Sequence, residues 1–307
     1  MSRVREKGVP IGDPSEGVAP AAIAGPGRSV LRRRWQAFLR NRGALVAGTC
    51  LILITLFTAA GPMLSGQDPD ATNLAEALKG PTWQHLLGTD ELGRDVLTRL
   101  MFGARVSLAV GLMAAFIATT VGTLIGTIGG FYGGWPDAVA MRFTDSLMSL
   151  PTFFLALTVI AVFGGGFTVL VLVIALTSWM GVARVVRGEC LRWKTREFVT
   201  AAQAIGASDV RVMLVHVLPQ AVSSIVVAGT LAIARAIIVE SALSYLGLGI
   251  QPPMPSWGNM LLNAQRYVWT APMLAVYPGL LISLTVLAFN FFGDGLRDAL
   301  SPFAMRR

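Results

Sequence analysis

Residues 196–220 read REFVTAAQAIGASDVRVMLVHVLPQ, a polar stretch set between long apolar runs. The pattern predicts a helix, a break at Gly206, a second short helix and then a span that begins near Pro219. Gly206 can turn the backbone at low steric cost, and Pro219 suits a first helical turn, where its missing N–H would have no partner anyway. The first part presents a thin surface that fits a groove on another protein, because it carries Ala201, Ala202, Ala204 and Ala207. An ordinary helical linker is the alternative that the pattern alone leaves open.

The composition around this stretch is that of a membrane protein. Of 307 residues, 54% are hydrophobic and only 14% are charged, which is too apolar for a soluble domain of this size. The net charge of +8 does not indicate nucleic acid, because the basic residues fall in blocks beside apolar runs. Cys50 and Cys190 are too few for a disulfide framework, so both are interpreted as reduced and structural.

Six apolar runs are long enough to cross a membrane. About 20 helical residues match a hydrocarbon core of roughly 30 Å. The sequence therefore predicts an all-α polytopic membrane protein with six transmembrane helices. The third run holds Pro151, and Gly164, Gly165 and Gly166 make the turn that follows it. The expected spans are residues 44–64, 106–128, 143–163, 167–186, 221–239 and 273–293.

The positions of Lys and Arg predict which side of the membrane each loop faces. Basic residues concentrate in the cytoplasmic loops of membrane proteins. Placing both termini and residues 200–219 in the cytoplasm satisfies this rule, since few of the 25 basic residues then lie outside. Those few are Lys79, Arg94, Arg99, Arg105 and Arg266, with Arg235 inside a membrane run. Residues 1–28 are expected to form a disordered cytoplasmic tail and no signal peptide.

The expected outer loop, residues 65–104, is acidic and is interpreted as a surface for a soluble extracytoplasmic partner. Its His85 is expected to be a surface or capping residue, not a metal ligand. His216 lies on the opposite side and is expected to shape the loop before Pro219. The two histidines therefore cannot form one metal site, and no Ser-His-Asp arrangement is credible.

Two charges lie in or beside the fifth run. A charge at bilayer depth costs at least ~2.5 kcal/mol on insertion scales, so it usually pairs or faces water. We hypothesise that Arg235 and Glu240 border a translocation route near its outer half, and the alternative is interface anchoring without substrate contact. Residues 241–272 hold too many prolines for a spanning helix and are expected to form a re-entrant or outer-surface lid. Trp257 and Trp269 are expected to be interfacial anchors.

The sequence has no phosphate-binding motif for ATP. A phosphate-binding loop needs Gly-Lys followed by Ser or Thr. The only lysines are Lys7, Lys79 and Lys194, and none follows a glycine. The energy for any active transport must therefore come from another protein.

Several motifs resemble those of one transporter family. The spacing of Ala201-Ala202, Gly206 and Leu218-Pro219 resembles the EAA motif of permease subunits of bacterial ABC importers, with Thr200 where the family usually has Glu. The segment HLLGTDELGRDVLTRLMFGARVSL (residues 85–108) resembles the second permease of dipeptide, oligopeptide and nickel importers. The similarity continues through residues 129–151 and 243–261 and covers nearly everything after the N-terminal tail.

This resemblance implies a type I ABC importer permease fold with a cytoplasmic coupling helix. It implies a heterodimer with a homologous permease, two ATPase subunits or domains and an extracytoplasmic substrate-binding protein. No cofactor is expected on this chain, and ATP and Mg would bind the partner subunits. The chain would be a transport subunit, not an enzyme, in the bacterial cytoplasmic membrane. The residues expected to couple it to the ATPases are Thr200, Ala201, Ala202, Gly206, Asp209, His216, Leu218 and Pro219.

The domain boundaries follow from the same resemblance. After the tail, residues 29–103 would hold the first transmembrane helix and outer loop, 104–296 the permease core, and 297–307 a cytoplasmic tail. Di- or oligopeptides are the expected substrates, with nickel chelates, glutathione or another small solute as alternatives. An ion-coupled secondary carrier would need an inverted repeat, which is not seen. An intramembrane enzyme would need a catalytic cluster at one depth, but Asp145 and Glu240 are expected near opposite ends.

Overall fold

A computed structural model describes residues 36 and 38–300, so the expected disordered tail (1–28) and residues 301–307 lie outside the described part. Within the described residues, every regular element is helical. The long helices are α2 (Arg42–Ser65), α3 (Val96–Tyr132), α6 (Phe167–Lys194), α9 (Leu218–Tyr245) and α11 (Met273–Leu300). Between them lie η1 (Leu74–Glu76), α4 (Gly134–Met148), α5 (Thr152–Phe163), α7 (Glu197–Ala204), α8 (Asp209–Arg211), η2 (Val212–Val217), α10 (Trp257–Ala264) and η3 (Gln265–Tyr267).

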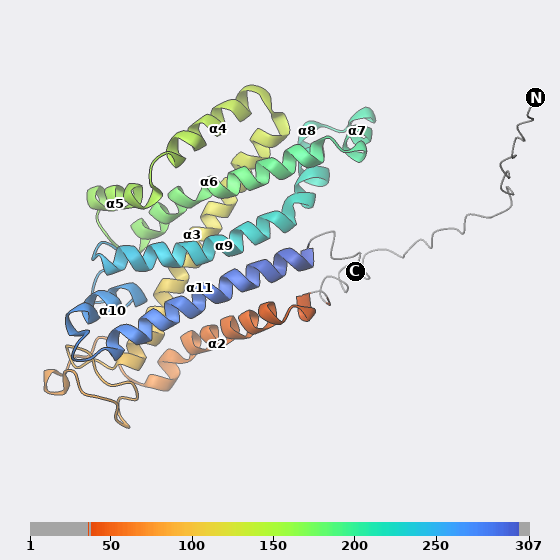
Figure 1. Cartoon of the computed structure of the whole chain (residues 1–307). Coiled ribbons are helices and arrows are strands. Elements are labelled where there is room, and N and C mark those ends of the chain that lie inside the picture. Colours follow the sequence, from red (N-terminus) through yellow and green to blue (C-terminus); the bar gives the residue numbers. More distant parts are fainter. Residues whose placement is uncertain (1–35, 37, 301–307) are drawn as a thin grey trace, which may run out of the picture.

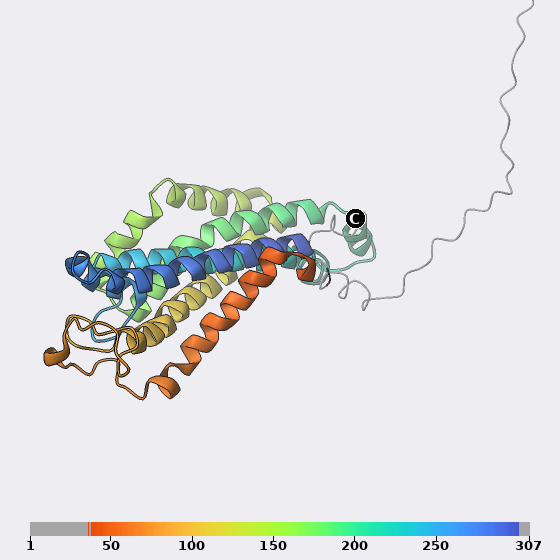
Figure 2. The same cartoon turned by 60° about the horizontal axis from the view of Figure 1, so that its bottom comes forward.

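The long helices form one bundle with two distinct ends (Figures 1 and 2). Helices α2, α11, α9 and α6 follow one another side by side, and α3 crosses behind them to pack against α2, α9 and α6. One end carries α7, α8, the start of α2 and the finish of α11. We call it the terminal end. The opposite end, which we call the loop end, carries residues 66–95 and α10.

In the part of the chain that the structure describes, five helices are long and apolar enough to span a membrane, and the bent pair α4 and α5 makes a sixth if it counts as one span. The expected all-α, six-span architecture is confirmed in this sense. The expected continuous helix 143–163 is wrong, because α4 and α5 meet at 83°. The break falls at Ser149–Pro151, since proline lacks an N–H and disfavours helical backbone in the residue before it.

The start of α3 also differs from the sequence-based expectation. Helix α3 begins at Val96, so the loop at this end finishes at Asp95 and not at residue 104. Asp95 caps that helix, because its Oδ2 accepts from the N–H and the hydroxyl of Thr98, both at 2.7 Å. A side-chain acceptor at this position satisfies one of the unpaired amides of the first turn. Sequence reasoning missed this start because Arg99 and Arg105 interrupt the apolar pattern.

Glycines let α3 and α6 approach closely. A Cβ built on Gly122 would lie 2.7 Å from the carbonyl oxygen of Trp179, and one on Gly130 would lie 2.7 Å from Cβ of Cys190. Backbone atoms cannot move aside as a flexible side chain can, so the close contact between these two helices depends on the missing side chains. This packing fixes α6, which contributes to both candidate sites described below.

Gly122→Ala is therefore expected to lower the free energy of unfolding by about 1–3 kcal/mol, the usual cost of overpacking. The midpoint of thermal unfolding in detergent, followed by size-exclusion chromatography, measures this change. Gly188→Ala is the matched control, because no atom lies within 4 Å of a Cβ at that position of α6. Equal midpoints for the two variants would contradict the packing argument.

Candidate functional site

Residues 196–220 form a compact hairpin of short helices at the terminal end (Figure 1). Helix α7 ends at Ala204, and Gly206 then adopts a left-handed φ of +87° before α8 and the π-helical turn η2. Helix α9 begins at Leu218 with Pro219 in its first turn. The predicted helix, glycine break, second short helix and proline-started span are all confirmed. His216 lies half-buried in η2.

The inner face of this hairpin is anchored to the bundle. Val199, Ala202, Val212 and Val217 are buried in one cluster with residues of α3 and α6. Those bundle residues are Phe131, Val182, Val186 and Cys190. Ala202 therefore packs inward, whereas the neighbouring Ala201 is exposed. The sequence suggested that the alanine pair forms one outward surface. It does not, because adjacent helical residues point in directions about 100° apart.

The outer face of the hairpin exposes several large apolar side chains. Ile205, beside Gly206, is 88% exposed, although a side chain of this size is normally buried. Thr200, Gly206 and Asp209 are also exposed. The larger apolar side chains exposed on the same hairpin are Phe198, Val210, Leu214 and Val215. Five large apolar side chains exposed on one short hairpin indicate a binding surface.

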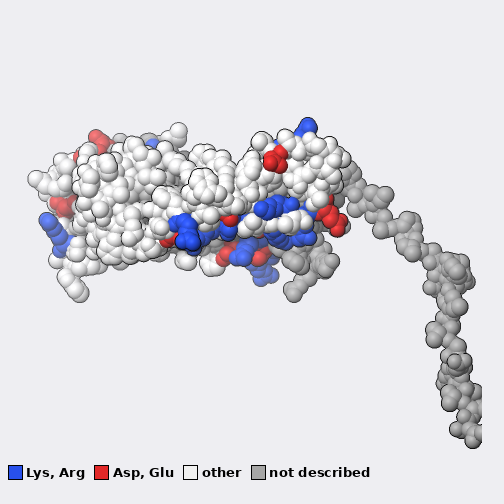
Figure 3. All heavy atoms as spheres, turned by 90° about the horizontal axis from the view of Figure 1, so that it is seen from above, with Lys and Arg blue, Asp and Glu red and all other residues white. Residues whose placement is uncertain are grey.

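Basic side chains gather toward the terminal end on one face of the molecule, whereas most of the loop-end half of that face is uncharged (Figure 3). Some of these charges tie helices together. Arg187 on α6 binds Asp137 on α4 through two hydrogen bonds, at 2.5 and 2.6 Å. A bidentate arginine–carboxylate pair fixes geometry as well as charge. It therefore holds α4 against α6 near the hairpin.

A cavity of about 530 Å³ opens between α4, α5, α6 and α9. Arg235 on α9 lines it together with Arg184 on α6. Arg184 pairs with Asp145 on α4 at 2.5 Å. Helix α6 continues beyond Arg184 to Lys194, past the expected end of this span at residue 186. The cavity size falls within the usual range for small-molecule sites.

Glu240 does not reach this cavity. It is fully buried, and its carboxylate accepts hydrogen bonds from Ser244 at 2.8 Å and Ser241 at 3.3 Å. Ser244 Oγ also accepts from the N–H of Ile250, which ties the last turn of α9 to the segment that follows. Arg235 and Glu240 were expected to border one route together, and the structure separates them. Only Arg235 is exposed.

The segment after α9 is folded onto the bundle. Trp257 is fully buried, its Nε1 donates to the carbonyl of Leu100 at 3.2 Å, and its N–H donates to Ser107 at 3.2 Å. The expected interfacial role of Trp257 is therefore wrong. Trp269, by contrast, is 93% exposed. Hydropathy alone cannot predict which of the two tryptophans is buried. The burial of Trp257 depends on the start of α10, where Ser256 and Asn259 form a capping box.

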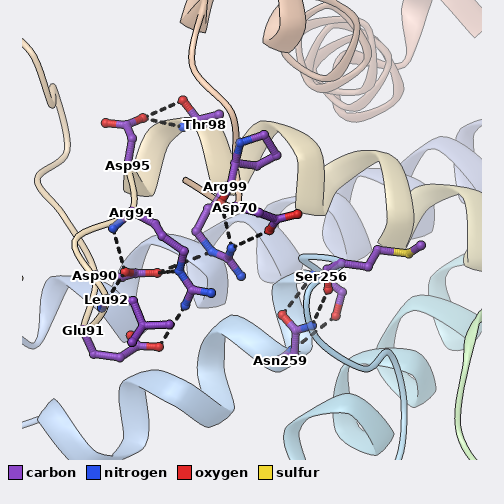
Figure 4. Close-up of polar contacts among 12 residues, drawn as sticks. Asp70, Asp90, Glu91, Leu92, Arg94, Asp95, Thr98, Arg99, Ser256 and Asn259 are labelled. Carbon is purple, nitrogen blue, oxygen red and sulfur yellow. Dashed lines mark hydrogen bonds and ion pairs between the residues drawn. The ribbon is translucent and has the colours of Figure 1, made fainter. Parts of the chain in front are cut away.

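At the loop end, many of the acidic residues bind arginines of the same chain (Figure 4). Asp90 is buried between Arg94, at 2.6 Å, and Arg99, at 3.5 Å. Arg99 also contacts Asp70 at 3.2 Å, and Arg94 contacts Glu91 at 3.0 Å. The negative charge expected of this loop is therefore neutralised within the chain at these groups. Sequence spacing could not show this, because Arg99 and Asp70 are 29 residues apart.

His85 bridges two carboxylates in the same layer. Its Nδ1 lies 3.0 Å from Asp95 and its Nε2 lies 3.2 Å from Glu76. Partial burial by itself lowers the pKa of His85, but the hydrogen bonds to Asp95 and Glu76 outweigh it and raise that pKa above its ordinary value. The hydrogen bond from His85, followed by Lys79, lowers the pKa of Glu76. The expected surface or capping role for His85 is wrong, since it joins two segments of the layer.

Because the folded-state pKa of His85 is raised, the protonated His85 side chain stabilises the fold. This stabilisation is complete at pH values below the unfolded-state pKa of about 6.5, and it is lost as pH rises through the folded-state pKa. Hydrogen exchange of residues 76–95, corrected for intrinsic rates, is expected to become faster relative to the bundle as pH rises from 6 to 9. His85→Gln should remove this pH dependence and leave exchange in α9 unchanged. A variant that keeps the same pH profile would contradict this assignment.

No group of three or more His, Cys, Asp or Glu side chains among residues 38–300 is arranged to hold a metal ion. The two histidines lie at opposite ends of the bundle, which agrees with their predicted separation. The described residues thus offer a membrane bundle, a mid-bundle cavity and an anchored apolar hairpin at one end. This combination is that of a transport subunit.

The chain belongs to the family of binding-protein-dependent transport system inner membrane components, which it matches over residues 122–306. It is therefore the permease subunit of an ABC importer, a multi-pass membrane protein and not an enzyme. Residues 29–81 also match the N-terminal transmembrane domain of oligopeptide transport permease C. A permease of this kind works with ATPase and substrate-binding partners.

Curated relatives resemble the chain over nearly its whole length. The glutathione transport system permease protein GsiD of Escherichia coli O1:K1 is 44% identical over 272 residues, which cover 87% of this chain and 89% of the relative. GsiD of Salmonella typhimurium is 45% identical over 276 residues, covering 90% and 91%. GsiD of Shigella flexneri serotype 5b is 46% identical over 272 residues, covering 87% and 89%.

Proposed function

We propose that this permease imports small peptides, with glutathione as the first candidate. The observation that carries the proposal is its similarity to GsiD permeases at 44–46% identity across both chains. The cavity beside Arg235 has a size suited to a short peptide. Nickel chelates and other small solutes are the alternative substrates, and an uptake assay must distinguish them from peptides.

The proposed orientation places the terminal end in the cytoplasm and the loop end outside. The distribution of Lys and Arg supports it, since basic residues favour the cytoplasmic side. The apolar hairpin would then face the ATPases, and the ion-paired layer of residues 66–95 would face the substrate-binding protein. A homologous permease would complete a heterodimer and cover the open side of the cavity.

In the proposed mechanism, the hairpin transmits ATPase movement to the bundle. Thr200, Ala201, Gly206 and Asp209 would touch the ATPase on the exposed face. Ala202 would act from the buried face, while His216, Leu218 and Pro219 would set the angle at which α9 begins. Because the inner cluster joins the hairpin to α3 and α6, nucleotide binding could bias the bundle between two openings.

Arg235 would border the translocation route in this mechanism. Glu240 would reach the route only in a conformation that opens its serine contacts, because it is fully buried here. The proposed contact with the route therefore applies to Glu240 only in that opened conformation, whereas Arg235 already lines the cavity.

Uptake by the purified transporter tests the proposed substrate. The complex would be reconstituted in proteoliposomes with its substrate-binding protein and ATP. Radiolabelled glutathione, alanylalanine and a nickel–histidine chelate would be compared, with an ATPase-inactive complex as the control. ATP-dependent uptake of either peptide supports the proposal. Uptake of the chelate alone, or uptake without the ATPases, contradicts it.

A further inference from the structure

The cavity between α4, α5, α6 and α9 contains a cation that has no partner among the described residues. Arg235 is exposed, and it makes no ion pair or hydrogen bond with any residue of the described part of the chain. The second arginine of the cavity, Arg184, is already paired with Asp145. The cavity therefore holds one neutralised guanidinium and one that remains free.

The free guanidinium lies at mid-depth in the bundle. A Cβ built on Gly181 would be 3.8 Å from Nη1 of Arg235, and Gly181 is halfway along the 28-residue helix α6. A charge at that depth is unfavourable unless it faces water or a counter-charge. Because Gly181 has no side chain, nothing from that position covers the guanidinium. Arg235 is therefore accessible from the cavity.

Hydroxyl groups lie on the same wall. Thr177 and Ser178 line the cavity one turn before Gly181. The Thr177 hydroxyl donates to the carbonyl of Val173 at 3.0 Å and can still accept. Ser178 makes no hydrogen bond with the described residues, so its hydroxyl can donate to an anion. Arginine binds carboxylates through charge-assisted hydrogen bonds, and a hydroxyl that lines the same cavity can add a further donor.

We propose that Arg235, assisted by Ser178, binds a carboxylate of the transported solute during its passage. This inference rests on the proposed function, because it requires a solute with a carboxylate, which every free peptide has. It makes Arg235 a specificity-determining residue of the permease itself, additional to any selection by the substrate-binding protein. Solutes without an anionic group would gain nothing from this contact.

The test compares variants of the complete transporter in the proteoliposome assay, with radiolabelled glutathione, or alanylalanine if glutathione is not carried. Arg235→Gln is expected to reduce ATP-dependent uptake at least tenfold, whereas Arg235→Lys, which keeps the charge, retains a third or more. Arg142→Gln is the control, because Arg142 is an exposed arginine of α4 outside the cavity lining, and it should stay within threefold of wild type. Assembly and basal ATP hydrolysis should be unchanged in all three.

Alanylalanine amide distinguishes carboxylate binding from a structural role. Uptake of the amide, measured with the same binding protein, should change less than threefold in Arg235→Gln. If wild type does not carry the amide, uptake of the carboxylate-bearing peptide alone tests the inference. Acid uptake near wild type, an equal loss of acid and amide uptake, or failure to assemble would overturn the inference. Failure to assemble would indicate a counter-charge on the partner permease. If wild type carries neither peptide, the proposed function fails and this inference fails with it.

Discussion

Gly206→Val is expected to abolish substrate-stimulated ATP hydrolysis while the protein still inserts into the membrane. Gly206 adopts a φ of +87°, which side chains branched at Cβ rarely tolerate. No atom lies within 4 Å of a Cβ built there, so the variant is strained only through its backbone. The hairpin must then change the direction in which α7 leads into α8. If this hairpin is the coupling element, the ATPases lose their connection to the bundle.

The assay measures ATP hydrolysis by the reconstituted complex with and without loaded binding protein. Gly188→Val is the matched control, because Gly188 also has no atom within 4 Å of a built Cβ but lies inside the regular helix α6. Valine favours a helix more than glycine does, so this control should retain stimulation. Normal stimulation in Gly206→Val would refute the coupling role of the hairpin.

Ile205→Glu is expected to weaken binding of the ATPase subunits by about 30- to 1,000-fold, which corresponds to the 2–4 kcal/mol of a typical hot spot. Ile205 is 88% exposed and adjoins the glycine turn, so it is the most prominent apolar side chain of the hairpin. An apolar side chain contributes most to the binding free energy when the partner fully desolvates it. A carboxylate buried in the same pocket would lack a partner and be costly.

Binding of the purified ATPase to the permease in nanodiscs would measure this loss. Gln203→Glu is the control, because it adds the same charge at an exposed position of α7 with almost no change in shape. It should bind within threefold of wild type. Equal weakening by both variants would point to charge repulsion and against an apolar anchor at Ile205. Full binding by Ile205→Glu would place the ATPase contact elsewhere.

The sites proposed for coupling and for substrate recognition are separated along the bundle. The hairpin lies at the terminal end, whereas Arg235 lines a cavity farther along α9. The close packing of α3 on α6 joins the two regions, because the hairpin cluster includes Val182 and Val186 of the helix that carries Gly181. Variants at the two sites should therefore fail differently. Hairpin variants should lose ATPase stimulation for every solute, and cavity variants should lose acidic solutes selectively.

The sequence determined the elements that depend on local chemistry. Apolar run length predicts the membrane helices, and Gly206 and Pro219 predict a turn and a helix start because their backbone preferences act within one or two residues. The resemblance of residues 85–108 and 243–261 to an importer permease identified the family that the comparisons confirm. Both kinds of information are carried by short, contiguous stretches.

Only the tertiary structure decided which polar groups meet. Asp90 with Arg99, His85 with Glu76 and Asp95, and the burial of Trp257 depend on segments that are brought together by folding. The separation of Arg235 from Glu240 has the same origin, since one faces the cavity and the other faces serines. Helical periodicity fixes directions around one axis, but the neighbours on each side are set by how the helices pack. That is why the sequence alone predicted most of the spans and the hairpin, and not the partners of their charges.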